Sequence, residues 1–481
     1  MRKLVFSFLG AAVVLSGAVV RVQAAPATCA VRSLVEHCES WSDVYGTPQD
    51  GQNAAVSVAI TPDGSRVLRA GYTAAAPNPQ GPVNGRDFVV AANDAGNGTR
   101  RWSATYDGPS AGDDQAVALT ISPDGTKAFV TGESQHSPGN YDYATVAYDV
   151  ATGSRLWVAR YDGPASRGDV PTGIATDGNR VYVTGYSSLG IHPTAGVDIY
   201  AATTIAYDVT TGAQQWLARY QGQAGLWDIP QGLAAAGGRV YITARSNGAG
   251  TSNDDTDDAT VAYNGTTGSR LWASRFDSGT RDYPHGLAAT TDGSRVYVTA
   301  ERTWNGFGAS DYVTLGYDGV SGARAWSAVY ATPGGGNEIP ISVAVSPAGD
   351  RVFVTGFGSD DITPVDRSAV TIAYSSSGQQ LWLSRHTTPG GEAMGKVAVS
   401  PDGQRAYVTG LAIGQSFGVG FGYIDVQAPA TLAYDTGSGA VVWSAHFLDQ
   451  GQGRDAVVSP DSSRVYVAVG GSDAATVAYD R

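Results

Sequence analysis

Tryptophan recurs through this chain at nearly constant intervals. Neighbouring members of a set of eight are 54 to 61 residues apart, and an aromatic ring or an imidazole follows each one four positions later. The eight are Trp41, Trp102, Trp157, Trp216, Trp272, Trp326, Trp382 and Trp443. A period of this length indicates a repeat architecture, in which each repeat is a small unit that packs against its neighbours.

One repeat shows four short runs that are typical of β-strands. The runs are rich in Val, Thr, Tyr and Ala, and they cover residues 116–121, 127–131, 143–149 and 155–161. Ser122-Pro123-Asp124-Gly125 predicts a turn between the first two runs, because Pro presets φ and Gly supplies a positive φ. Thr152-Gly153 predicts the turn before the fourth run.

Four antiparallel strands of this length cannot bury both faces of their sheet alone, but radial stacking of such sheets buries them. The first three strands recur eight times, and the chain stops at Arg481, before the last fourth strand. Residues 39–45 supply a strand of the missing kind. We therefore predict an all-β fold over residues 39–481. It is a single eight-bladed β-propeller of four-stranded antiparallel blades, with the last blade closed by the N-terminal strand.

The start of the chain has the features of an export signal. A basic start is followed by an apolar run to Val20 and by small residues, so we expect residues 1–24 to be a cleaved signal peptide. An uncleaved membrane anchor is the alternative. In the segment 25–38, Cys29 and Cys38 are expected to form a disulfide in an oxidising compartment. The predicted location is secreted, periplasmic or on the exterior of the cell envelope, with no membrane span after cleavage.

Composition excludes several classes of protein. The 481 residues carry a formal charge of −13, and the pI near 4.8 argues against a nucleic-acid partner because phosphates need a basic surface. Hydrophobic residues make up 42% and charged ones 16%, which excludes a disordered polyelectrolyte.

Two motifs resemble those of known propeller repeats. Ala147-Tyr148-Asp149-x-x-Thr152-Gly153-x-x-x-Trp157 resembles the tryptophan-docking motif of quinoprotein-like propellers, and it recurs from Ala206 to Trp216. Ser400-Pro401-Asp402-Gly403 followed by Tyr407-Val408-Thr409-Gly410 is similar to the bacterial YVTN-type repeat. The resemblance implies a propeller. Quinoprotein dehydrogenases generally carry an adjacent cysteine pair that this sequence lacks, so pyrroloquinoline quinone is not expected.

Acidic residues recur at two positions of the repeat. We call one end of the blades the loop face; it holds the loops that follow the second and fourth strands. An acid precedes each of six first strands there: Asp114, Asp169, Asp228, Asp282, Glu338 and Glu392. Such a ring could hold Ca²⁺ through oxygen ligands, with Asp114, Asp169 and Glu392 as weak candidates. The competing interpretation is that these acids, like the aspartates opening the third strands, satisfy backbone amides.

Residues that break the repeat are the better candidates for a site. Trp227 and Trp304 lie outside the tryptophan register, and His285 follows Asp282 by three positions. The predicted ligand-binding set on the loop face is Trp227, Asp228, Asp282, His285, Trp304, Phe307 and Glu338. Exposed aromatic rings suit a sugar or a planar ligand. The alternative is that they fold over the blade ends as small satellite cores.

The sequence lacks the zinc-protease motif and the complete phosphate-binding loop with its Ser or Thr. We therefore predict a monomeric, exported binding scaffold that presents its loop face to a protein or glycan, and that is not an enzyme. The alternative is a quinoprotein-like oxidoreductase or another propeller enzyme, such as a lactonase, with Ca²⁺ at the channel mouth. Asp282 and His285 would then be candidates for an oriented base. A purely structural envelope protein is the third possibility.

Overall fold

The computed structural model describes residues 14–15, 18–19, 39–45, 53–74, 85–193, 196–223, 225–248, 256–303, 309–332, 335–359, 367–388, 391–414, 426–447, 451–471 and 474–481. Regular secondary structure in these ranges consists of β-strands alone, which confirms the predicted all-β class. The same ranges accordingly hold no helix that could cross a membrane. Cys29 and Cys38 lie outside the described residues, so the predicted disulfide stays a prediction.

After the short hairpin of β1 (Val14–Leu15) and β2 (Ala18–Val19), the strands fall into four sets by their place in the repeat. The first strands are β4 (Ala54–Ile60), β8 (Asp114–Ile121), β12 (Asp169–Thr176), β16 (Asp228–Ala236), β20 (Arg281–Ala289), β24 (Glu338–Val345), β28 (Glu392–Val399) and β32 (Gly451–Val458). The second strands are β5 (Arg66–Ala74), β9 (Lys127–Ser137), β13 (Arg180–Ile191), β17 (Arg239–Asn247), β21 (Arg295–Thr303), β25 (Arg351–Gly358), β29 (Arg405–Gly414) and β33 (Arg464–Gly471).

The third strands are β6 (Arg86–Asp94), β10 (Asn140–Asp149), β14 (Asp198–Asp208), β18 (Thr256–Asn264), β22 (Ser310–Asp318), β26 (Ser368–Ser375), β30 (Val426–Asp435) and β34 (Ala474–Asp480). The fourth strands are β7 (Arg100–Tyr106), β11 (Arg155–Tyr161), β15 (Gln214–Tyr220), β19 (Arg270–Phe276), β23 (Arg324–Tyr330), β27 (Gln380–His386), β31 (Val441–His446) and β3 (Glu39–Tyr45).

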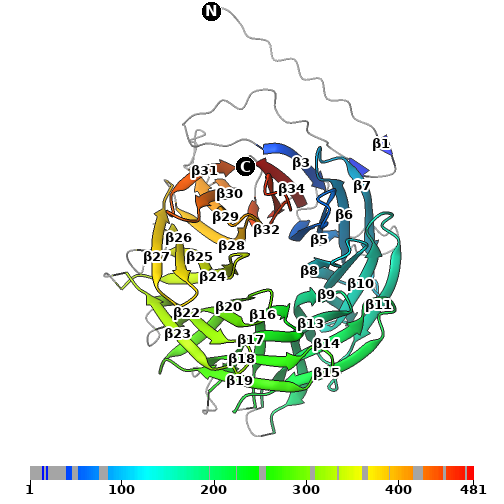
Figure 1. The fold of residues 1–481 in the computed structure, drawn as a ribbon. Helices are drawn as coiled ribbons and strands as arrows, with labels where there is room; N and C mark the ends of the chain where they lie inside the picture. The colour runs from blue at the N-terminus through cyan, green and yellow to red at the C-terminus, as the bar shows by residue number, and fades with distance from the viewer. Residues whose placement is uncertain are drawn as a thin grey trace, which may run out of the picture.

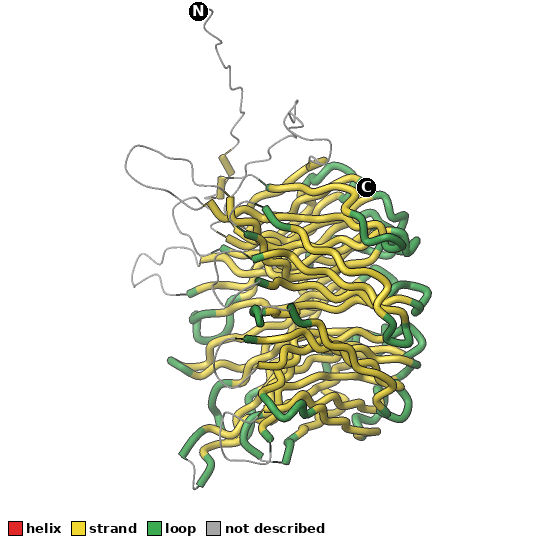
Figure 2. The backbone as a smooth tube through the Cα atoms, turned by 90° about the vertical axis from the view of Figure 1, so that its left-hand side faces the viewer, coloured by secondary structure: helices red, strands yellow, loops and turns green. Residues whose placement is uncertain are grey.

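Each set of four strands forms an antiparallel sheet in sequence order, and the 32 strands from β3 to β34 fit eight such blades. We number them from blade 1 (β4–β7) to blade 8 (β32, β33, β34 and β3). The blades are arranged radially, with the first strands next to a central opening and the fourth strands on the outside (Figure 1). Loops gather at two opposite ends of the strands (Figure 2). One end is the loop face, and the other, which holds the tight turns, is the turn face.

The predicted turn at Ser122–Gly125 is confirmed in atomic detail. The Ser122 hydroxyl donates to Asp124 Oδ1 at 2.5 Å, and the Thr126 amide donates to the same oxygen at 3.0 Å. The hydroxyl and the amide together lower the pKa of Asp124 to about 2. Gly125 has φ of 73°, the left-handed region that favours glycine. The sequence signal and the local structure therefore agree at this turn.

The eight recurrent tryptophans join neighbouring blades. The indole of Trp102 donates from Nε1 to the carbonyl of Val150 in the next blade at 2.9 Å. Gly153 lies flat against this indole: a Cβ added there would sit 2.5 Å from Trp102 Cδ2, and φ is 74°. The same glycine–indole contact recurs, with Gly98, Gly153, Gly212, Gly268, Gly322, Gly378 and Gly439 on Trp41, Trp102, Trp157, Trp216, Trp272, Trp326 and Trp382. These tryptophans therefore pack between neighbouring blades.

The N-terminal strand pairs with the C-terminal one. β3 is antiparallel to β34, with Trp41 opposite Ala478 and Tyr45 opposite Ala474. β3 also contacts blade 1 through Asp43, which is 2% exposed. Its carboxylate accepts hydrogen bonds from Arg69 at 2.9 Å, Asn93 at 2.8 Å and Arg100 at 2.6 Å. Burial alone would raise the pKa of Asp43, but the two guanidinium groups outweigh it and hold this pKa below its ordinary value.

Candidate functional site

Every first strand carries a β-bulge at the same place. The register with the second strand skips one residue in each blade, for example between Ala55 and Ser57 in β4 and between Pro284 and Gly286 in β20. The eight skipped residues are Val56, Val117, Thr172, Gln231, His285, Ile341, Gly395 and Arg454. A bulge re-aims a side chain out of the ladder. All eight line the axial cavity, and we call them the channel ring.

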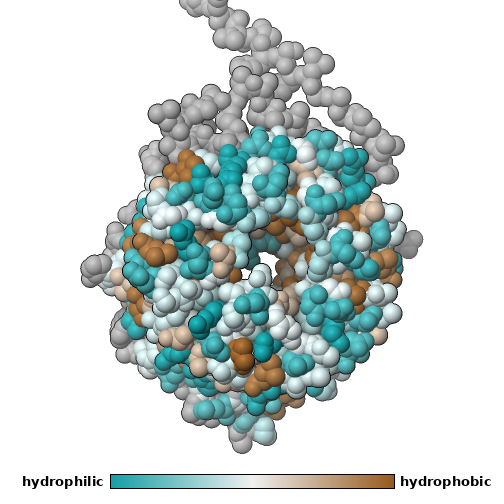
Figure 3. Space-filling model, in the orientation of Figure 1, coloured by the Kyte–Doolittle hydropathy of each residue, from teal (hydrophilic) through white to brown (hydrophobic). Residues whose placement is uncertain are grey.

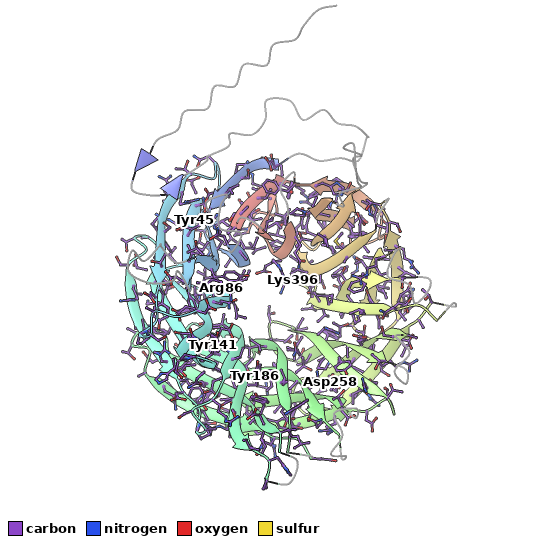
Figure 4. All side chains as sticks on the ribbon, turned by 180° about the vertical axis from the view of Figure 1, so that it is seen from behind. Tyr45, Arg86, Tyr141, Tyr186, Asp258 and Lys396 are labelled. Carbon is purple, nitrogen blue, oxygen red and sulfur yellow. The ribbon has the colours of Figure 1, made fainter. Side chains whose placement is uncertain are left out.

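The axial cavity has a volume of about 400 Å³ and is lined by residues of all eight first strands. It opens at the centre of the face seen in Figure 3. Most of the lining is apolar or small, but Lys396, Arg454 and Asp455 bring charges to the arc formed by blades 7 and 8. Lys396 lies at the rim of the opening in Figure 4. The channel is therefore charged on one side, and although many lining residues are apolar, the surface exposed to the channel is mostly polar.

His285 lies in the channel ring and bonds to a different acid from the one that the sequence suggested. Its Nε2 is 3.3 Å from Glu301 Oε2 on β21. Asp282 is instead fully buried, and it accepts hydrogen bonds at 2.8 Å from both the amide and the hydroxyl of Ser278. Burial raises the pKa of Asp282 to about 6, although the hydrogen bonds of Ser278 lower it. The structure thus places these two candidates in different environments.

A second set of variable residues surrounds the channel mouth on the loop face. Each member lies on a second strand. It pairs with the first-strand residue two positions before the bulge residue, as Tyr186 pairs with Val170. We call Tyr72, Glu133, Tyr186, Arg245, Glu301, Phe357, Leu411 and Gly470 the mouth ring. These residues are aromatic, acidic, basic or aliphatic from one blade to the next.

Aromatic and basic side chains contact each other around this mouth. Arg86 lies over the ring of Tyr72, with its guanidinium carbon 5.3 Å from the centroid, and Arg367 lies over Phe357 at 4.7 Å. Arg245 lies over Tyr283 at 5.0 Å. Tyr186 meets Tyr200 edge to face, with centroids 5.2 Å apart. These contacts hold large flat surfaces in place at the rim, which is the kind of surface that binds sugars and peptides.

The acids that open the first strands cap the preceding loops. Asp114 accepts from the Gly108 amide at 2.6 Å, Asp169 from Gly163 at 2.5 Å and Asp228 from Gly222 at 2.8 Å. Glu338 accepts from the hydroxyl of Thr332, and Glu392 lies 2.6 Å from His386 Nδ1. All of them are almost completely buried. This bonding corresponds to the structural interpretation of the recurrent acids.

Three junctions between blades also gather aspartates into groups. Each group combines an Asp of a third strand, an Asp after a fourth strand and the Asp that opens the next first strand. The groups are Asp87, Asp107 and Asp114; Asp142, Asp162 and Asp169; and Asp257, Asp277 and Asp282. Within each group, one ligand oxygen from every member lies within 4.8 Å of the others. Carboxylate oxygens are ligands that Ca²⁺ accepts, so these residues could hold a cation.

The three aspartate groups differ in their counter-charges. Arg160 Nη2 lies 2.9 Å from Asp142 Oδ2, and Arg275 forms the equivalent pair with Asp257. In the group of Asp87, the position that corresponds to these arginines is Thr105. Burial and the charges of Asp107 and Asp114 raise the pKa of Asp87 to about 6. This group therefore has the weakest compensation of its negative charge.

Trp227 is held against the end of blade 3. Its indole Nε1 donates to the Asp198 carbonyl at 2.6 Å, and its backbone amide donates to Asn247 Oδ1 at 2.9 Å. Its backbone also forms an isolated parallel bridge with Tyr200. The side chain is half-buried, as in the satellite-core alternative. Trp304 and Phe307, the other two aromatic candidates, lie outside the described residues.

Comparisons with known proteins agree with this architecture. Residues 201–382 match a protein family described as outer membrane protein assembly factor BamB. The resemblance to quinoprotein-like propeller repeats is confirmed. No curated protein matches the sequence.

Solved propellers resemble the whole fold. A quinohemoprotein alcohol dehydrogenase from Comamonas testosteroni has 12% identity and a TM-score of 0.56, with 92% of this chain and 76% of that chain covered. The C-terminal WD40 domain of Sif2 has 12% identity and a TM-score of 0.55, with 93% and 99% covered. Chaetomium thermophilum Sqt1, bound to the N-terminus of ribosomal protein L10, has 13% identity and a TM-score of 0.52, with 90% and 98% covered. At these identities the likeness concerns the fold alone.

The channel does not fit a quinone cofactor. No aromatic side chain other than the imidazole of His285 is among the residues that line the cavity, so the described part of the channel offers no pair of flat surfaces between which a fused-ring quinone would stack. The recurrent indoles are instead packed between the blades. The residues present therefore do not correspond to a quinone site.

Sequence reasoning found His285 but missed the other charged residues of the channel. Arg454 is the bulge residue of β32, and Lys396 follows the bulge residue of β28 in the preceding blade. An alignment of the eight first strands at the bulge would have shown Arg and Lys only in blades 7 and 8. The missing signal was the bulge itself, because a simple alternation of inward and outward residues assigns these side chains to the wrong face.

Proposed function

We propose that this protein is an exported, monomeric binding module, and that a protein or glycan of the cell envelope or exterior binds at its loop face. In this proposal residues 1–24 direct export, and the pairing of β3 with β34 closes a ring of eight blades. The fold itself hosts many functions, so the proposal rests on the surface at the channel mouth.

The observation that carries the proposal is the contrast between a repeated frame and a variable mouth ring. The tryptophans, turn residues and opening acids recur from blade to blade, as structural residues do. The mouth ring changes its chemistry from Tyr72 to Glu133, Tyr186 and Arg245. A partner without eight-fold symmetry needs such asymmetry, because each of its groups meets a different side chain.

Binding to a panel of envelope polysaccharides, peptidoglycan fragments and envelope-protein peptides tests the proposal. The purified protein should bind one class, and Tyr186→Ala should weaken that binding at least tenfold, because aromatic anchors dominate binding energy. Leu156→Ala is the matched control, since Leu156 is an exposed residue of β11 on the outer wall. Equal binding by wild type and Tyr186→Ala, with Leu156→Ala weakened, would place the binding surface elsewhere.

The aspartate groups favour a second candidate, a propeller enzyme that uses Ca²⁺ at the loop face. Metal analysis of the purified protein and an absorbance scan for a bound chromophore separate the two functions. Stoichiometric Ca²⁺ together with a chromophore supports the enzyme. A purified protein that carries neither of them supports the binding module. Mass spectrometry of the exported protein checks the signal peptide, since the mature chain should begin after residue 24.

A further inference from the structure

Two basic side chains stand in the axial channel of a strongly acidic protein. The chain has a formal charge of −13 and only three lysines, and one of these, Lys396, lines the channel. Arg454 lies beside it on the neighbouring first strand. Both side chains are exposed. An acidic protein gains nothing in solubility from cations placed there, so their position calls for a physical explanation.

Arg454 is directed to the axis by the bulge in β32. The register skips it between Gly453 and Asp455, which takes its side chain out of the alternating pattern of the strand. Across the described ranges its guanidinium forms no hydrogen bond and no ion pair with another residue. Its five donors are therefore available to a ligand in the channel.

The one acid nearby is already satisfied. Asp455 Oδ2 accepts from the Ser57 hydroxyl at 2.9 Å and from the Val58 amide at 3.0 Å, which ties blade 8 to blade 1. Its Oδ1 accepts from the Ala456 amide at 3.0 Å and lies 3.8 Å from Lys396 Nζ. Two cations and one hydrogen-bonded carboxylate leave this arc of the channel with a net positive charge.

The surface of the remaining lining is mostly polar, with apolar side chains among it. Val117 and Ile341 project from their bulges, and Leu119 and Leu287 also line the cavity. Gln231 comes from β16, which lies across the central opening from β32 (Figure 1). A volume of about 400 Å³ is within the range of small-molecule sites. The cavity thus combines a cationic arc with a mostly polar remaining surface, at a size that excludes a folded partner.

We propose that the axial channel binds a small organic acid, with its carboxylate at Arg454 and Lys396. Arginine pairs with a carboxylate through two parallel hydrogen bonds, and lysine adds a point charge. This site goes beyond the loop-face function and does not depend on it, because its ligand lies inside the ring.

Calorimetric titration with hexanoate at low ionic strength tests the site. Hexanoate should bind with a stoichiometry of about one. Hexanamide, which has the same body without the charge, should bind at least tenfold more weakly, because hydrogen bonds between charged groups are stronger. Equal affinities for hexanoate and hexanamide, or no binding of hexanoate, would overturn the proposal.

Variants then locate the site. Arg454→Gln and Lys396→Gln should each weaken hexanoate binding about 10- to 100-fold with an unchanged melting temperature, since both side chains are exposed. Lys127→Gln makes the same change of charge at the start of β9, on the turn face, and should bind as wild type does. Binding that Lys127→Gln weakens as much as Lys396→Gln would show an effect of overall charge and overturn the site.

Discussion

Two rings of eight residues surround the same axis, and they follow opposite rules. The docking ring consists of eight tryptophans, seven of which pack on a glycine of the next blade. The channel ring occupies one bulge per blade, and only valine occurs in it twice. The same packing contact is needed at every junction between blades, so one residue type serves at all of them. A ligand on the axis, in contrast, would contact a different side chain from each blade. Repetition therefore marks the residues that pack the blades together, and the proposed channel site lies among residues that vary.

The seam between the first and last blades is where the repeated frame is interrupted. Arg69 is buried on β5, at the position where other second strands have Val130, Val183 or Ile242. Asp43 faces it from β3. A buried ion pair replaces apolar packing at this junction, so the seam should be more sensitive to single changes than the other junctions.

The largest expected effect is that of removing the strand at the seam. Deletion of residues 39–46 leaves β34 with an unpaired edge and Arg69 without its carboxylate. An open strand edge promotes association between molecules. Size-exclusion chromatography should show aggregates, and thermal unfolding should begin at a lower temperature. A deletion variant that stays monomeric with an unchanged melting curve would refute closure of the ring by β3.

Asp43→Asn tests the same seam with one atom exchanged. Two buried guanidinium groups lose their counter-charge, which should cost about 3–5 kcal/mol of unfolding free energy at pH 7. Arg101→Gln breaks an exposed pair with Asp94 and should cost only about 0–1 kcal/mol.

The pH dependence of stability checks the cause of the Asp43 effect. The folded-state pKa of Asp43 lies below its ordinary value of 3.8, so its contribution is present above that value and is lost as pH falls through the folded pKa. Wild type should lose more stability than Asp43→Asn on acidification below pH 4. Parallel pH profiles for the two proteins would mean that the ion pair contributes nothing.

A substitution in each ring, made on the neighbouring blades 3 and 4, sharpens the comparison. Trp216→Ala should reduce the free energy of unfolding by about 3–5 kcal/mol, because it opens a cavity between blades 3 and 4 and removes the hydrogen bond to the Gly265 carbonyl. Gln231→Ala changes an exposed side chain in the channel and should stay within about 0.5 kcal/mol of wild type. Denaturant titration measures both. Equal losses would end the distinction between the rings.

Asp258→Asn is expected to stabilise the protein. Asp258 is completely buried on β18 and accepts from the Thr243 hydroxyl at 2.6 Å. Burial raises its pKa to about 7, so the stability that it contributes is present below pH 4 and is lost as pH rises through 7. The neutral amide avoids this loss, which should gain about 2–4 kcal/mol at pH 8 and little at pH 4. A variant that is less stable than wild type at pH 8 would contradict the assignment.

The frame of the molecule could be predicted because each repeat carries local signals. The turn at Ser122–Gly125 depends on side chains within four residues of one another, and the tryptophan register depends on a repeated spacing. Asp43 and Arg69 left a signal as well, since they are charged where equivalent strands are apolar. Only an alignment of all eight repeats makes that signal visible. Trp227 was assigned to the loop face, but the sequence did not reveal that its indole bonds to the Asp198 carbonyl.

By itself, the sequence determined the strand class, the repeat and the pairing of blades through tryptophan, because these features arise from interactions that are local or repeated. The tertiary structure alone decided which side chains meet on the axis. The bulges turn His285 and Arg454 out of the strand alternation, and residues from eight distant segments then share one cavity. Such a meeting depends on the radial arrangement of all eight blades, which no single repeat encodes.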